Sequence, residues 1–150
     1  MDLLPCRVKG VFVAVTPAGT APTVILEAGD DTCLPIYIGL WEAISINTAL
    51  QSEVSPRPLT HDLFPELFGR FSVSLKALHI DSIEGGVFYA NLVLCRNNHE
   101  DIIDCRPSDG IAIALRCNSP IFLERAVIEE SGLKPEQMPA FIDLQSFLQG

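Results

Sequence analysis

The sequence predicts a single compact α+β domain with a mixed, mainly antiparallel sheet and three or more helices packed on it. Two blocks of the sequence contain short, strand-like segments separated by turn-forming residues, as in β-hairpins. Segments with helical periodicity lie between these blocks and after the second one. The 150 residues are 48% hydrophobic and 19% charged, which suits one domain with one buried core.

The first block of strands is expected over residues 7–15, 24–26 and 34–38. β-Branched residues are frequent in these stretches, and turn-forming residues at 16–22 and 29–31 separate them. This order of strand, turn, strand, turn and strand is typical of antiparallel hairpins.

Helical periodicity replaces the strand pattern from Leu40 onward. Four apolar residues then share one helical face: Ala43, Ile46, Leu50 and Val54. We therefore predict a helix over residues 40–54. Pro56 and Pro58 end it, because proline lacks a backbone N–H donor and disfavours helix in the residue before it. A second, short helix is expected to end at Gly69.

The second block begins with a predicted strand over residues 71–79, in which apolar and polar side chains alternate. A Gly-Gly pair and an Asn-Asn pair then mark the two turns of a three-stranded meander. Pro107 is expected to open a helix that continues to Arg116. The remainder is predicted to contain a brief strand and two helices, over residues 121–123, 126–130 and 135–148.

Two regions are distinguished along the chain. Residues 1–130 contain the predicted sheet and most of the helices. Residues 131–150 are predicted to form a helical extension, because Phe141, Leu144 and Leu148 share one helical face. We expect this extension to pack on the same domain or on a partner subunit.

Charge and cysteine content limit the classes of function. The formal net charge is −9 and the basic residues are not clustered, which disfavours binding of nucleic acid through a basic surface. Five cysteines occur without the spacing of a zinc site, so we expect reduced thiols and a cytoplasmic protein. The apolar stretches are too short to cross a bilayer, and motifs for organic cofactors are lacking, so neither a membrane nor an organic cofactor is expected.

Residues 57–62 (RPLTHD) bring four chemically useful side chains together. Arg57 could bind phosphate, and Thr60 could add a substrate-binding hydroxyl. His61 could transfer a proton near neutral pH, and Asp62 offers hard oxygen ligands to a metal ion. The same segment could instead simply start a helix, with Thr60 as its cap and Asp62 beside its positive end.

Residues 104–109 (DCRPSD) form a similar segment at a predicted strand end and helix start. Backbone amides at a helix start favour anions. Arg106 and Ser108 could therefore contact a phosphate, while Asp104 and Asp109 could hold a divalent metal. In the alternative, Ser108 and Asp109 only occupy the first turn of the helix and Arg106 pairs with a carboxylate.

Both segments place an arginine and a proline shortly before a hydroxyl and an aspartate. This repetition predicts one shared cleft in which arginine and aspartate side chains meet. Carboxylates at short range raise one another's pKa unless a cation lies between them. We therefore predict a Mg²⁺ or Mn²⁺ ion held by Asp62, Asp104 and Asp109, with Glu42 as a reserve ligand.

Four segments carry a resemblance to a known family: residues 35–39 (PIYIG) with Glu42 and Ala43, 57–63 (RPLTHDL), 86–90 (GVFYA) and 104–112 (DCRPSDGIA). In order and spacing they resemble the bifunctional nuclease domain family, over about residues 8–130. The resemblance implies a compact α+β fold, a homodimer, and cleavage of both DNA and RNA. It also implies six site candidates: Arg57, His61, Asp62, Asp104, Arg106 and Asp109. The chain departs from the family pattern at Gly110, where Ala is usual, and at Pro65.

The leading hypothesis is a metal-assisted nuclease that hydrolyses phosphodiester bonds of DNA or RNA, with His61, Asp62, Arg106 and Asp109 as catalytic candidates. An alternative of a different class, favoured by the net charge of −9, is a non-catalytic dimeric binding or regulatory module. Carboxylates that converge in an open cleft would favour the enzyme, and separate salt bridges would favour the module. A third hypothesis, a small-molecule hydrolase, requires a deep apolar pocket beside these groups.

Overall fold

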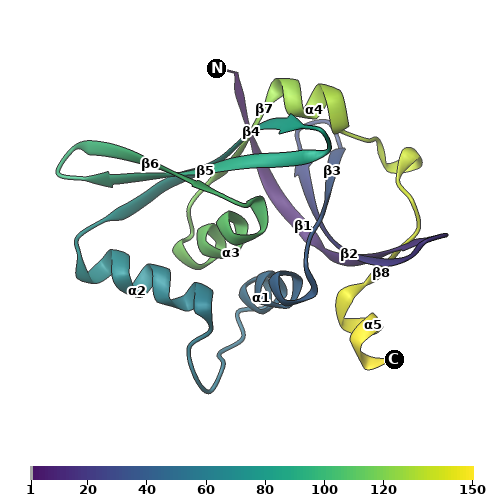
Figure 1. Ribbon diagram of the computed structural model, residues 1–150, viewed down its shortest axis with the longest axis horizontal. Helices are drawn as coiled ribbons and strands as arrows, with labels where there is room; N and C mark the ends of the chain where they lie inside the picture. Colours follow the sequence, from purple (N-terminus) through teal and green to yellow (C-terminus); the bar gives the residue numbers. More distant parts are fainter. Residues whose placement is uncertain (1) are drawn as a thin grey trace.

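A computed structural model describes residues 2–150 as one eight-stranded sheet with helices packed on it (Figure 1). The strand order is β3-β2-β1-β7-β4-β5-β6, and β8 pairs with β1 outside this path. The strands are β1 (Leu3–Thr16), β2 (Gly19–Ala28), β3 (Thr32–Tyr37), β4 (Ser74–Glu84), β5 (Val87–Arg96), β6 (His99–Cys105), β7 (Ile121–Glu124) and β8 (Phe141–Asp143). Neighbouring strands are antiparallel except β4 and β7, which run parallel.

Five α-helices and two short 3₁₀ turns complete the fold. They are α1 (Leu40–Leu50), η1 (Thr60–Asp62), α2 (Leu63–Arg70), α3 (Pro107–Cys117), α4 (Arg125–Ser131), η2 (Pro135–Gln137) and α5 (Leu144–Gln149). α1 and α3 pack beside each other, and α2 contacts α3 (Figure 1). The predicted α+β class, with a mixed and mainly antiparallel sheet, is confirmed. No helix within residues 2–150 has the length and apolar character needed to cross a membrane.

The close contact between α3 and the sheet fixes the position of the α3 N-terminus. Seven of its eleven residues are buried: Pro107, Ser108, Gly110, Ile111, Ala112, Ile113 and Ala114. A Cβ atom added at Gly110 would lie 2.5 Å from Leu78 Cδ1 on β4 and 3.1 Å from Cys105 Sγ at the end of β6. The missing side chain at Gly110 therefore lets the first turn of α3 pack tightly against the sheet.

The predicted helix over residues 40–54 is too long. α1 ends at Leu50, and Val54 is exposed. Ser52 has a left-handed backbone with φ of 54°, so the chain leaves the helical path before the prolines of the loop. Pro65 is compatible with α2, because this helix begins at Leu63 and the first backbone N–H groups of a helix have no partner within it.

The predicted helix over residues 135–148 is wrong. This segment begins with the 3₁₀ turn η2, continues as β8 and becomes helical only at Leu144. β8 satisfies its backbone groups on β1, from Phe12 opposite Asp143 to Ala14 opposite Phe141. Residues 141–143 thus form a strand, in spite of their helical periodicity, because they pair with an otherwise open edge of β1. The segment therefore packs on its own chain.

Candidate functional site

A chain of hydrogen bonds joins α1, η1 and α3 at the start of α3. Ser45 Oγ lies 2.6 Å from His61 Nδ1, and His61 Nε2 lies 2.9 Å from Asp109 Oδ1. Ser45 and His61 are both buried, whereas the side chain of Asp109 is 29% exposed. Asp109 is therefore the member of this Ser45–His61–Asp109 relay that reaches solvent.

The direction of the relay follows from the charge of Asp109. Burial would raise the pKa of the Asp109 carboxyl, but hydrogen bonds from Arg106 and His61 outweigh burial and lower this pKa. Since an ionised carboxylate only accepts hydrogen bonds, His61 carries a proton on Nε2. In the neutral imidazole, Nδ1 then accepts a hydrogen bond from the Ser45 hydroxyl. The relay thus holds His61 in one tautomer and one orientation.

Arg106 forms a fork on the outer side of Asp109. Its Nε donates to Asp109 Oδ2 at 2.8 Å, and its Nη2 donates to Asp109 Oδ1 at 3.1 Å. Its Nη1 lies 3.8 Å from Glu42 Oε1, which is beyond hydrogen-bonding distance. The side chain is 66% exposed, so the guanidinium keeps donors for a further acceptor.

Asp62 has both carboxylate oxygens engaged within the protein. Arg116 Nε donates to Oδ1 at 2.7 Å, and the Leu59 backbone N–H donates to Oδ2 at 2.7 Å. Arg116 is itself 8% exposed and also donates to the carbonyl oxygens of Ala112 and Ser45, at 3.0 and 3.2 Å. The hydrogen bond from Arg116 lowers the pKa of Asp62. Asp62 therefore joins η1 to α3, close to the helix-start role considered as the alternative.

The three carboxylates predicted as metal ligands do not meet in one cleft. Asp104 is exposed on β6 and lies opposite Asn91 of β5, and strand alternation places it on the other face of the sheet from its neighbour Cys105, which faces α3. Within residues 2–150, no group of three or more His, Cys, Asp or Glu side chains could hold a metal ion. The side chains present thus do not form a ready-made Mg²⁺ or Mn²⁺ site.

The two predicted phosphate-binding arginines are also separated. Arg57 and Thr60 are exposed, and Arg57 belongs to the loop between α1 and α2. This loop projects away from the junction of β6 and α3 (Figure 1). Of the predicted site residues, the structure gathers His61, Arg106 and Asp109, with Ser108 at the same helix start.

An open groove of about 440 Å³ lies beside Arg106. Its walls come from the end of β3, the turn between β4 and β5, and the start of α3: Ile36, Tyr37, Ile38, Gly39, Gly86, Val87, Phe88, Arg106, Pro107 and Ser108. The turn between β4 and β5 lies close to β3 in the fold (Figure 1). The volume falls within the range of small-ligand sites, roughly 300–1,000 Å³.

The sequence pattern of the bifunctional nuclease domain matches residues 24–136, which include Ser45, His61, Arg106 and Asp109. The chain belongs to this family. An uncharacterized protein of Mycobacterium tuberculosis (strain H37Rv) is 42% identical over 128 residues, covering 85% of this chain and 76% of that protein. Bifunctional nuclease 1 of Oryza sativa subsp. japonica is 32% identical over 115 residues, covering 75% of this chain and 35% of the rice protein. Bifunctional nuclease 1 of Arabidopsis thaliana is 24% identical over 118 residues, covering 75% of this chain and 36% of that protein. The chain thus spans about a third of the length of these plant relatives.

Sequence reasoning missed two side chains of this bifunctional nuclease domain. Ser45 was not singled out, because a serine in a helical stretch gives no local sign of burial or of a partner sixteen residues away. Arg116 was expected only to end a helix, without a role in the site, whereas its side chain binds Asp62, which lies 54 residues earlier in the sequence. Both contacts depend on how α1 and α3 pack together, which periodicity alone does not specify.

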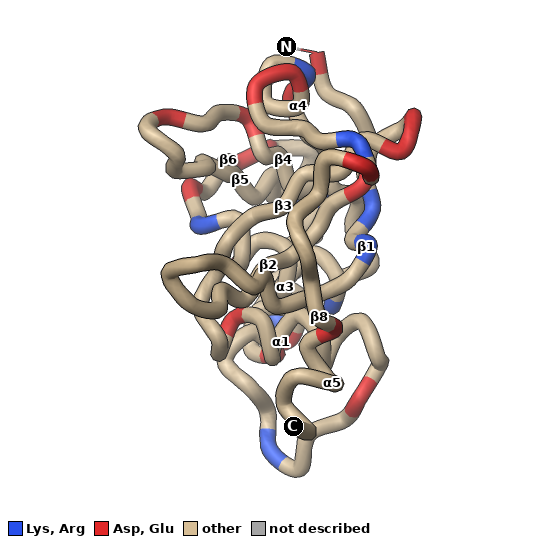
Figure 2. The backbone as a smooth tube through the Cα atoms, turned by 90° about the vertical axis from the view of Figure 1, so that its right-hand side faces the viewer, with Lys and Arg blue, Asp and Glu red and all other residues tan. Residues whose placement is uncertain are grey.

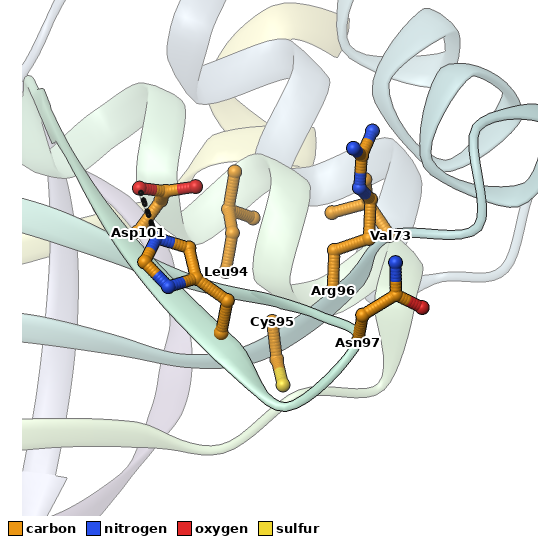
Figure 3. A pocket seen from close by; sticks show the side chains of 7 residues that line it. Val73, Leu94, Cys95, Arg96, Asn97 and Asp101 are labelled. Carbon is orange, nitrogen blue, oxygen red and sulfur yellow. Dashed lines mark ion pairs between the residues drawn. The ribbon is translucent and has the colours of Figure 1, made fainter.

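A second hollow, of about 430 Å³, lies at the turn between β5 and β6 (Figure 3). The labelled side chains around it include Cys95, Arg96 and Asp101. His99 and Asp101 form an exposed pair there at 3.5 Å. β6 separates this hollow from the start of α3 by roughly 20 Å at about 3.3 Å per residue, so it is not part of the relay.

Acidic and basic residues are interspersed along the backbone, without a continuous basic stripe in the view shown (Figure 2). The net charge of −9 agrees with this distribution. Arg106, with a side chain that is 66% exposed, is the most accessible of the gathered site residues.

Proposed function

We propose that this bifunctional nuclease domain hydrolyses phosphodiester bonds of DNA and RNA, with Asp109 and Arg106 at the reacting phosphate and His61 behind them. The observation that carries the proposal is the buried Ser45–His61–Asp109 relay, which ends beside an exposed guanidinium at a helix start. Family membership and the names of the plant relatives support the same reaction.

Arg106 binds the phosphate in this proposal. Its Nη1 is free to donate at once, and displacement of Asp109 would release its other donors for bidentate binding. The backbone N–H groups of Ser108 and Asp109 lie in the first turn of α3, where side-chain capping is missing, and point to the same region as further donors. These groups stabilise the negative charge that builds on the phosphate oxygens during attack.

Asp109 acts as the general base. While Arg106 is bound to it, the pKa of Asp109 stays low and the carboxylate is a weak base. When Arg106 turns to the phosphate, Asp109 loses those hydrogen bonds and its basicity increases. It then accepts a proton from the attacking water, the P–O bond breaks, and the leaving oxygen takes a proton from solvent.

His61 positions Asp109 in this scheme. Both ring nitrogens of His61 are bonded within the protein, so the direct proton transfer expected from the sequence is assigned to Asp109 instead. The carboxylates of residues 2–150 do not form a preformed three-ligand site, so the proposed steps use only side chains of the protein. Mg²⁺ often needs only one or two carboxylates together with substrate phosphates, so metal dependence belongs in the test.

The test is incubation of pure protein with single-stranded DNA, duplex DNA and RNA in Mg²⁺, Mn²⁺ or chelator. Asp109→Asn should lower cleavage by about a hundredfold or more, as expected for loss of a general base. Asp101→Asn, the same chemical change at an exposed site on β6, is the matched control and should cleave like the wild type. Equal cleavage by wild type and Asp109→Asn would identify a contaminating nuclease. Loss of metal-dependent activity in Asp104→Asn would instead favour the ligand set expected from the sequence.

The second candidate is a non-catalytic dimeric binding or regulatory module. It is favoured by the engagement of Asp62 with Arg116 and of Asp109 with Arg106, in which both carboxylates are satisfied within the protein. Under this proposal, purified protein cleaves no substrate under any metal condition. In either case we propose a cytoplasmic homodimer.

A further inference from the structure

The lining of the groove beside Arg106 has two chemically different parts. One part is the start of α3, with a cationic side chain and helix donors. The other is a set of aromatic and aliphatic side chains from β3 and β5. A ligand that fills this groove therefore needs an anionic group and a flat or apolar group.

Ser108 adds a hydroxyl-bearing residue to the cationic side of the groove. It is 5% exposed, yet it lines the groove. Within residues 2–150 no side-chain hydrogen bond includes the Ser108 hydroxyl, and its oxygen is not among the fully enclosed unpaired atoms, so it is open to the groove. Ser108 lies in the first turn of α3 and lines the groove together with Arg106, and a hydroxyl, a guanidinium and the first N–H groups of a helix together suit a phosphate.

Tyr37 belongs to the apolar part of the lining. It is the last residue of β3, lines the groove and is 59% exposed. Val87 and Phe88 of β5 face the same groove, and glycines at positions 39 and 86 leave its rim free of side chains. An exposed aromatic ring beside an apolar wall is the usual surface on which an unpaired base stacks.

We propose that this groove binds one unpaired nucleotide of a single strand, with its phosphate at the start of α3 and its base stacked on Tyr37. This proposal rests on the proposed nuclease function, which it extends to a preference for single-stranded substrate. A base within a duplex is stacked on its neighbours and would have to be extruded before it could reach Tyr37. The volume of about 440 Å³ suits one nucleotide better than a longer segment.

The experiment measures binding without cleavage, by fluorescence anisotropy of labelled strands in chelator. Three ligands are compared: a single-stranded oligonucleotide, an abasic strand of equal length, and a duplex. Tyr37→Ala should weaken binding of the base-bearing strand by roughly fivefold to a hundredfold, the range expected for loss of one base stack. Tyr37→Phe should bind within twofold of wild type, because stacking needs the ring and not the hydroxyl.

Two further variants separate stacking from phosphate binding. Tyr89→Ala removes the other tyrosine of the chain, which is exposed on β5 outside the groove, and should not change binding. Arg106→Gln should weaken binding of the base-bearing and abasic strands alike. The abasic strand should bind Tyr37→Ala as well as it binds wild type.

Several results would overturn the base-stacking proposal. The proposal fails if Tyr37→Ala binds the base-bearing strand as tightly as wild type does, or if Tyr37→Ala weakens binding of the abasic strand equally. It also fails if wild type binds the duplex more tightly than the single strand, or binds no single strand at all. Cleavage is scored separately, so the two proposals can fail independently. If binding depends on the base but no strand is cleaved, the stacking proposal stands and the nuclease proposal fails. If strands are cleaved but Tyr37→Ala has no effect on binding, the nuclease proposal stands and the stacking proposal fails.

Discussion

Removal of the Asp62 carboxylate leaves the Arg116 charge with only backbone carbonyl partners. Loss of one partner of a buried ion pair costs about 3–5 kcal/mol. The Arg116 side chain is 8% exposed, but that of Asp62 is 38% exposed, and the carbonyl oxygens of Ala112 and Ser45 remain as acceptors. Because of this exposure and these remaining acceptors, we expect Asp62→Ala to lower the free energy of unfolding by about 2–3 kcal/mol, at or below the lower limit for a buried pair.

Urea denaturation measures this loss as a lower transition midpoint at an unchanged m-value. For a chain of this length, the melting temperature should fall by roughly 5–10 °C. Asp62→Asn is the matched variant, because its amide oxygen still accepts a hydrogen bond from Arg116 although the charge is lost. It should lose less stability than Asp62→Ala.

The loss should also depend on pH. The hydrogen bond from Arg116 lowers the pKa of Asp62 in the folded protein. The stabilisation is therefore fully present above the unfolded pKa of about 3.9 and is lost as pH falls through the lower folded value. The difference between wild type and Asp62→Ala should stay constant from pH 6 to 8 and shrink below about pH 4. A change under about 0.5 kcal/mol, typical of surface substitutions, or a gap that widens in acid, would refute the argument.

Four further outcomes are expected. Gly110→Ala should cost about 1–3 kcal/mol in urea denaturation, because its Cβ would lie 2.5 Å from Leu78 Cδ1, and Leu78→Val should soften the penalty in the double variant. Ser45→Ala should slow cleavage about tenfold, less than Asp109→Asn, because it removes one hydrogen bond that orients His61. The slope of log binding constant against log salt concentration should be shallow, about −1 to −2, because few phosphates are contacted. Light scattering should give about twice the 16.4 kDa of one chain, and a monomer mass would exclude the proposed dimer.

Local signals in the sequence were sufficient for much of the fold. Pro107 at the first position of α3, and the glycine and asparagine pairs at the two meander turns, have the backbone conformations that those residues favour. The end of α1 and the strand β8 were mispredicted, because solvent exposure and pairing with β1 decided them. Neither is visible in the periodicity of a single segment.

The candidate site divides in the same way. His61 and Asp109 were both singled out, and they meet because each lies at a helix start that packs against the other. Asp62 was expected to share their cleft, but the long side chain of Arg116 reaches it from the last turn of α3. A sequence pattern identifies side chains that are capable of chemistry. It does not specify which other side chain each of them contacts in the folded protein.

The pairing of β1 has a consequence for how the chain is made. One side of this strand is completed by β7 and β8, and the partners of Phe12 to Ala14 lie about 130 residues further along the chain. A growing polypeptide therefore carries β1 with part of its hydrogen-bonding edge open until residues 121–143 have left the ribosome. Such distant pairing slows folding, and during that interval the open edge of β1 can pair with a strand of a neighbouring nascent chain.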